Sequence, residues 1–205
     1  MIPSVIMASE EINFVEKQIK TAHIDIKFPE IYGLSNDQIQ NEINGMIYNK
    51  VFEFMNEDKL PPEDKNKKNY WGSYAIPFRK DHIISIVFNQ FGYLPRAAHP
   101  NSGIKSITID LDRGKALRIV DLFRSPSNYR SILNNIMTNQ LKKKRIHLFT
   151  DFKGIQNDDQ EFYLTNKALV IYYQEDVYTP HAYGPLVFTI PYTDLKNELK
   201  YISLW

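Results

Sequence analysis

Two strand-like segments separated by three polar residues set the strongest limit on the fold of this 205-residue chain. Residues 70–78 and 82–91 are expected to be strands, and residues 79–81 stand between them. In the second strand one face would carry Ile84, Ile86 and Phe88, and the other Ile83, Ser85, Val87 and Asn89. So short a connection joins antiparallel strands, because parallel strands need a crossover of a dozen or more residues. The chain is therefore expected to contain an antiparallel sheet.

Other segments extend this sheet and add helices. A helix capped by Ser35 or Asn36 should run to residues 55–58, because apolar side chains recur there at helical spacing. A second helix is expected at about 128–147. The remaining elements are strands at 23–28, 104–111, 117–119, 162–164, 168–173 and 186–190, and a short final helix from residue 191. This order predicts an α+β fold, a curved antiparallel β-sheet packed against two main α-helices.

A soft boundary near Phe123 divides the chain. We expect an N-terminal extension at 1–21, an N-terminal α+β half at 22–123 and a C-terminal α+β half at 124–205 that shares the core. The first eleven residues lack a basic segment followed by an apolar stretch, so a signal peptide is absent from the printed sequence.

Charge and composition exclude several classes of function. Lys and Arg number 25 and Asp and Glu 24, a formal net charge of +1, which argues against nucleic acid as a partner and against a polybasic membrane anchor. No apolar run is long enough for a transmembrane segment. With no cysteine, the chain has no disulfide, thiol nucleophile or cysteine-ligated metal.

Motifs for catalysis, metals and cofactors are missing. The five histidines show no metal-binding spacing, and neither a G-x-S-x-G elbow nor a glycine-rich phosphate loop occurs. Asp110 and Asp112 fit a turn, whereas Glu175 and Asp176 stand in an irregular aromatic loop. We therefore expect no catalytic residues, no metal and no cofactor.

Two irregular loops carry the residues best suited to binding. Residues 93–101 and 178–185 mix Tyr, His, Pro and small side chains, and Pro lowers the entropy that a loop loses on binding. The candidate binding residues are Tyr93, His99, Asn101, Tyr178, His181 and Tyr183. The cationic run at 142–145 suits the end of a helix, and it could also meet an acidic partner or an anionic wall polymer.

The two loops and their flanking strands resemble a known pair of domains. The runs 88–101 (FNQFGYLPRAAHPN) and 107–123 (ITIDLDRGKALRIVDLF), with 161–173 and 180–192, are similar to the paired domains of unknown function in the extracellular part of lysozyme-sensing anti-sigma factors of the RsiV type. The same pair resembles the N-terminal module of Gram-positive peptidoglycan deacetylases of the PdaC type. The family usually has glycines before the loop histidine, where this chain has Arg96, Ala97 and Ala98.

This resemblance implies a non-enzymatic, extracytoplasmic or secreted binding module from a Gram-positive bacterium. Its partner would be a cell-wall glycan or a secreted wall-active protein such as lysozyme. One alternative is a wall glycan or peptide hydrolase that uses His99 and His181 with Asp110, Glu175 or Asp176. Another alternative is a structural spacer.

Overall fold

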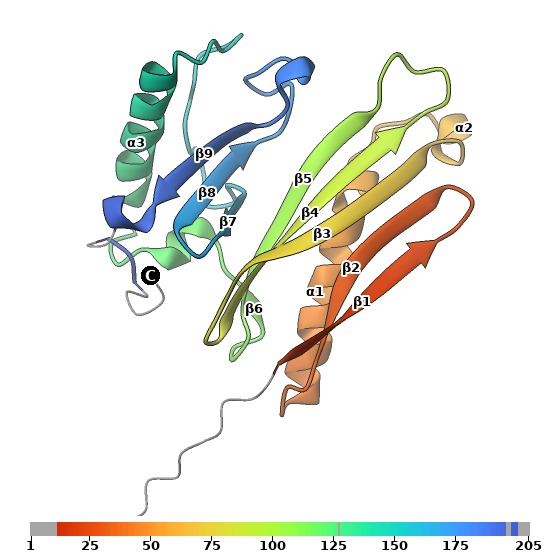
Figure 1. Ribbon diagram of the computed structural model, residues 1–205, viewed down its shortest axis with the longest axis horizontal. Helices are drawn as coiled ribbons and strands as arrows, with labels where there is room; N and C mark the ends of the chain where they lie inside the picture. Colours follow the sequence, from red (N-terminus) through yellow and green to blue (C-terminus); the bar gives the residue numbers. More distant parts are fainter. Residues whose placement is uncertain (1–11, 127, 196–197, 201–205) are drawn as a thin grey trace, which may run out of the picture.

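A computed structural model describes residues 12–126, 128–195 and 198–200 and contains two sheets and two long helices (Figure 1). The strands are β1 (Asn13–Lys20), β2 (Ile24–Tyr32), β3 (Asn69–Lys80), β4 (Ile83–Tyr93), β5 (Asn101–Asp110), β6 (Lys115–Ala116), β7 (Phe162–Leu164), β8 (Ala168–Tyr173) and β9 (Leu186–Pro191). The helices are α1 (Asp37–Asn56), the short α2 (Pro62–Lys65) and α3 (Tyr129–Lys144), with 3₁₀ turns η1 (Ile119–Leu122), η2 (His181–Tyr183) and η3 (Tyr192–Asp194).

The six-stranded sheet follows the chain in the order β1 to β6, and β7, β8 and β9 form a second sheet. Neighbouring strands are antiparallel except β2 and β3, which are parallel because α1 and α2 cross over between them. The α+β class, the antiparallel pairing and the two main helices are confirmed. One continuous sheet was also expected, but the strands after α3 form a sheet of their own.

Helix α1 begins and packs as its sequence predicts. The Asn36 side chain accepts a hydrogen bond from the Ile39 amide at 3.1 Å and caps the helix. Its buried stripe consists of Ile43, Ile47, Val51 and Phe54. The stripe packs against one face of the six-stranded sheet. No described helix combines the length and the apolar character that crossing a bilayer requires.

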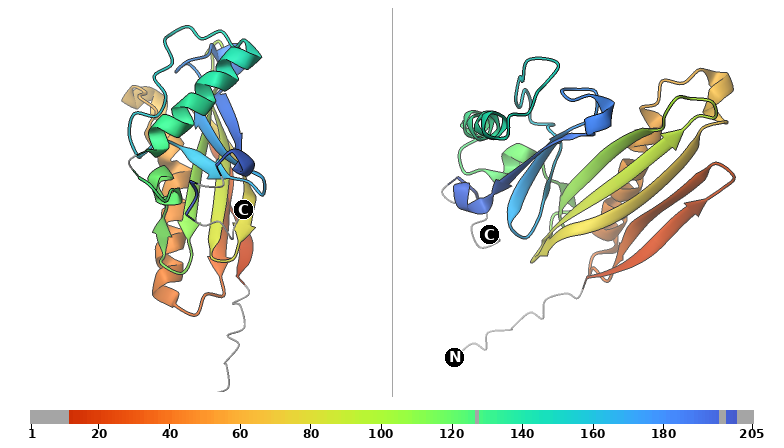
Figure 2. Two further views of the ribbon diagram at one scale, coloured as in Figure 1. Left: turned by 90° about the vertical axis from the view of Figure 1, so that its left-hand side faces the viewer. Right: turned by 45° about the horizontal axis from the view of Figure 1, so that its top comes forward.

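Strand β4 is buried on both faces, because each half of the molecule packs on one of them. Ile84, Ile86 and Phe88 pack with α1, whereas Ile83 joins the core of the second half. On that second face the Ser85 hydroxyl accepts a hydrogen bond from the Leu164 amide of β7 at 3.0 Å. The three-stranded sheet therefore packs on the face of the larger sheet opposite α1, with α3 on its far side (Figures 1 and 2).

The halves have separate cores. The second core joins Leu133 and Met137 of α3 to strands β7–β9, and Phe78 and Ile83 enter it from the larger sheet. Four residues of the segment before α3 also belong to this second core: Ile119, Val120, Leu122 and Phe123.

Two details differ from the sequence-based expectations. Residues 13–20, which were assigned to the extension, form the edge strand β1, whereas residues 1–11 lie outside the described part. The strand expected at 117–119 lies earlier in the chain, as β6 at Lys115–Ala116, because the 3₁₀ turn η1 begins at Ile119.

Candidate functional site

The two irregular loops meet. Residues 94–100 connect β4 to β5, residues 174–185 connect β8 to β9, and both loops lie at the upper end of the molecule in Figure 1. The imidazole rings of His99 and His181 stack with their centroids 4.1 Å apart and their planes at 28°. Side chains 82 positions apart in the sequence thus form one surface.

The edge of β5 holds the second loop in place. The Gln174 side chain accepts a hydrogen bond from the Ile104 amide at 3.1 Å and donates one to the Ile104 carbonyl at 2.6 Å, as a neighbouring strand would. The next residue, Glu175, accepts from the Ser102 amide at 2.8 Å. Two consecutive side chains therefore satisfy a free strand edge and fix the start of the aromatic loop.

The Glu175 carboxylate also organises the polar part of the site. It accepts a second bond from the Ser102 hydroxyl at 2.8 Å, and its Oε2 lies 3.1 Å from Nδ1 of His181. His99 is held locally, with its Nδ1 3.0 Å from the Pro100 carbonyl. The carboxylate thus sets the orientation of one imidazole, and the ring stack places the other beside it.

This arrangement lacks the relay that activates a serine. In a catalytic triad the imidazole takes the proton of the serine and the carboxylate supports the imidazole. Here the Ser102 hydroxyl donates to Glu175, and the same carboxylate oxygen faces His181. The geometry fits a positioned recognition surface better than a nucleophile with its base.

The candidate residues have different surroundings. Tyr183 is 81% exposed, and Tyr93 is half-buried at the end of β4. Tyr178 is buried among Phe152 and Tyr173, and its hydroxyl accepts from the Lys153 amide at 3.2 Å. We therefore reassign Tyr178 from ligand contact to support of the loop.

Asn101 belongs to a neighbouring polar group. Its amide donates to the Asp58 carboxylate at 3.3 Å, which also accepts from Lys68 at 2.7 Å and Tyr70 at 2.6 Å. Burial and the bond to Asp58 raise the pKa of the Tyr70 hydroxyl. This network anchors the base of the first loop to the segment after α1, so Asn101 supports that loop from the α1 side of the sheet.

Sequence reasoning missed three residues beside the loops. Trp71, Phe91 and Ser102 are direct neighbours across β3, β4 and β5. Trp71 is 46% exposed and Phe91 48% exposed on the face opposite α1. The sequence shows which face of each strand these residues occupy. It does not show which end of that face the second sheet leaves uncovered.

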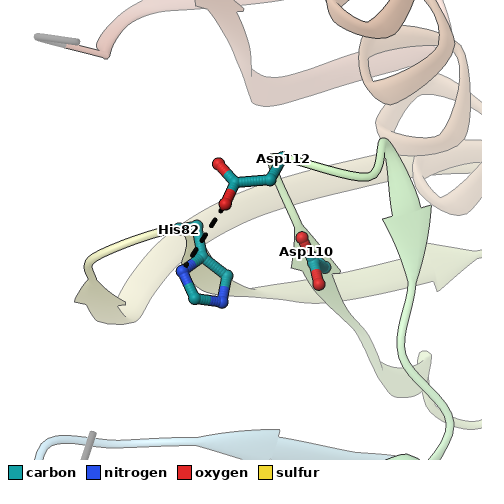
Figure 3. A group of neighbouring side chains, drawn as sticks. All are labelled: His82, Asp110 and Asp112. Carbon is teal, nitrogen blue, oxygen red and sulfur yellow. Dashed lines mark ion pairs between the residues drawn. The ribbon is translucent and has the colours of Figure 1, made fainter. Parts of the chain in front are cut away.

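A second group of titratable side chains lies at the opposite end of β4 and β5 (Figure 3). Ligand atoms of His82, Asp110 and Asp112 all lie within 4.8 Å of one another, and His82 Nδ1 is 3.8 Å from Asp112. Nitrogen and carboxylate ligands could hold a divalent cation. Asp110, however, accepts from the Arg113 amide at 3.1 Å and lies 3.6 Å from its guanidinium group, as expected of a turn residue. Asp110 also lies at the opposite end of β5 from the His99–His181 stack, so it cannot act together with those histidines.

Two family models match separate parts of the chain. Residues 120–193 match the family described as a protein of unknown function (DUF3298), and residues 15–102 match the family described as deacetylase PdaC. The anti-sigma-V factor RsiV of Bacillus subtilis strain 168 is 29% identical over 214 residues, which cover 97% of this chain and 73% of RsiV. The peptidoglycan-N-acetylmuramic acid deacetylase PdaC of the same strain is 25% identical over 128 residues, 62% of this chain and 27% of that protein.

Solved structures support the same assignment of the fold. Two DUF3298 proteins, from Bacteroides fragilis and Pseudomonas aeruginosa, have TM-scores of 0.65 and 0.64 at 16% and 12% identity. Each alignment covers 96% of this chain and 96% of the solved chain. The resemblance seen in the sequence is therefore confirmed: the first half of the chain matches the PdaC family model and the second half matches the DUF3298 family model.

Proposed function

We propose that this chain is a non-enzymatic binding module that acts outside the cytoplasm. Its partner is cell-wall related, either a lysozyme-like protein or peptidoglycan, and the surface made by the two loops binds it. The observation that carries this proposal is the convergence of the loops at the stacked His99 and His181, beside the exposed ring of Tyr183.

The physical character of the surface supports recognition. Tyr183 offers an aromatic face and a hydroxyl at little entropic cost, because its side chain has few rotatable bonds. Glu175 and the edge of β5 hold the loop before any ligand arrives, which lowers the ordering cost of binding. Exposed Trp71 and Phe91 extend the surface along the sheet.

The relatives support the choice of partner and location. PdaC is named as a deacetylase of peptidoglycan N-acetylmuramic acid, and this likeness supports a peptidoglycan-related partner for the chain. Peptidoglycan lies outside the cytoplasmic membrane, so a module for a wall partner acts there. RsiV carries the same kind of chain as part of an anti-sigma factor, which is consistent with detection of a wall-related partner.

Calorimetry with lysozyme and with soluble muropeptides tests this function directly. We expect heat of binding with one of them, and we expect Tyr183→Ala and His181→Ala to weaken it. Tyr32→Ala is the matched control, because Tyr32 is 48% exposed at the far end of β2. The absence of heat with either ligand would refute the proposal and favour a spacer domain.

A hydrolase remains the second candidate because His99 and His181 do approach each other next to Glu175. The hydrolase hypothesis expects product release from purified peptidoglycan, with loss of activity in His181→Ala and in Glu175→Gln. The binding hypothesis expects no release from either the wild type or the variants.

A further inference from the structure

A cleft of about 590 Å³ opens between the end of α3 and the second loop. One wall contains Lys144 and Arg145, and the other contains Pro180 and Tyr183. The Phe149 amide donates to the Tyr178 carbonyl at 3.1 Å and joins the two walls. The cleft is therefore built into the fold and is continuous with the loop that carries His181.

The cleft lies in a region of uncompensated positive charge. Lys142, Lys143, Lys144 and Arg145 are all exposed, and among the described residues none of them forms an ion pair with an acid. His147 adds a further basic side chain to the lining. The run complements the negative end of the α3 dipole, but one or two cations would be enough for that purpose. The remaining charge favours an anion in the cleft.

The opposite wall adds apolar and aromatic surface. Phe149 is 57% exposed and Tyr183 is 81% exposed, and both line the cleft with Pro180 and Pro185. A pocket with aromatic faces and a few charged groups orients a ligand that has both apolar and ionised parts. Sugar rings present C–H faces that pack on aromatic side chains, and a carboxylate pairs well with Arg and Lys.

From this combination we propose that the cleft binds a carboxylate-bearing glycan. Peptidoglycan supplies this chemistry in N-acetylmuramic acid wherever the peptide stem has been removed, because the lactyl group is then a free carboxylate rather than an amide. The inference rests on the proposed function and deepens it, because it selects the glycan rather than a protein as the partner for this part of the surface. Lys144 and Arg145 hold the carboxylate, and Tyr183 packs on the ring.

Two disaccharides separate the contribution of the carboxylate from that of the sugar. N-acetylglucosaminyl-N-acetylmuramic acid and di-N-acetylchitobiose differ by the lactyl group, and the methyl ester of the first keeps its shape without the charge. We expect calorimetry to give at least about fivefold tighter binding of the free acid at low salt, which is the effect of one exposed charge pair near 1 kcal/mol. Added salt should remove this preference by screening.

A pair of double variants tests the location. Lys144→Gln/Arg145→Gln and Lys142→Gln/Lys143→Gln remove the same charge from the same end of α3, but only the first pair lines the cleft. We expect the first variant to lose the preference for the free acid and the second to keep it. Thermal unfolding monitored by circular dichroism should show both variants folded.

The outcomes separate this inference from the proposed function. Equal affinity for the acid, the ester and chitobiose, or equal effects of the two double variants, would overturn the carboxylate site and leave a binding module. Binding of lysozyme without binding of either disaccharide would likewise overturn the glycan assignment alone. Failure to bind any of these ligands would overturn both.

Discussion

Replacement of Glu175 by Ala should loosen the attachment of the second loop to β5. The carboxylate is 9% exposed and accepts two hydrogen bonds from Ser102 at 2.8 Å. A hydrogen bond to an ionised group contributes about 1.5 kcal/mol at the low end of its range, so the two together stabilise the fold by about 3 kcal/mol. The contact with the more exposed His181 adds little to that sum.

Urea unfolding monitored by far-ultraviolet circular dichroism measures this loss. We expect Glu175→Ala to reduce the free energy of unfolding by about 3 kcal/mol, and Glu175→Gln by about 1 kcal/mol, because the amide oxygen can still accept from one Ser102 donor. Ser102→Ala removes only the hydroxyl, and its effect should nearly vanish in the Glu175→Ala background.

The same variants should separate stability from binding. In Glu175→Ala, ligand affinity should fall even where the protein remains fully folded, because His181 loses the group that orients it. An unfolding free energy within about 0.5 kcal/mol of the wild type, with unchanged affinity, would refute the role assigned to this carboxylate.

Four further substitutions test other parts of the structure. Burial raises the pKa of the Glu161 carboxyl despite the nearby Lys105. The protonated carboxyl therefore stabilises the fold below the ordinary pKa of Glu, and this stability is lost as pH rises through the raised pKa of the folded state. Glu161→Gln should gain stability relative to the wild type as pH increases, which urea unfolding at several pH values measures. Gly45→Ala in α1 should stabilise the protein by about 0.5–1 kcal/mol, because the added methyl group meets no atom within 4 Å. Gly154→Ala should destabilise it in the same assay, because Gly154 has φ +66° and a side-chain amide crowds it. The opposite order of stability would contradict these backbone roles. Tyr178→Ala should lower the unfolding free energy by about 3–5 kcal/mol, because it removes a buried aromatic side chain. A loss below about 1 kcal/mol would contradict its role in the core.

Local structure could be predicted where the information was local. The cap at Asn36 and the apolar spacing of α1 depend on residues within a few turns of one another, and both expectations were correct. The residues of β4 predicted a strand with apolar side chains on both faces, because Ile83 and Val87 lie on the face opposite Ile84 and Ile86. The partner of that second face was not predictable, because the bond between Ser85 and Leu164 of β7 joins residues 79 positions apart.

The site was predictable in composition and not in geometry. Tyr, Pro and His marked the two loops, but the meeting of His99 and His181 depends on how the second sheet docks on the first. Gln174 and Glu175 attach the second loop to β5, and as isolated polar residues at the end of a strand they gave no pattern to recognise. The burial of Tyr178 was not predictable either, because an aromatic side chain in an irregular loop can point into the core as well as outward.

The attachment of the loop to β5 has a consequence for how the two domains work together. The first half of the chain contributes His99 and the strand edge at Ser102 and Ile104, and the second half contributes Glu175 and His181. Neither half holds both loops, although Phe78 and Ile83 of the larger sheet pack in the second core. Side-chain bonds to a strand edge therefore fix the relative position of the two loops. A ligand that touches both loops would bind the paired state in preference to a separated one, and its binding energy would stabilise the junction of the domains.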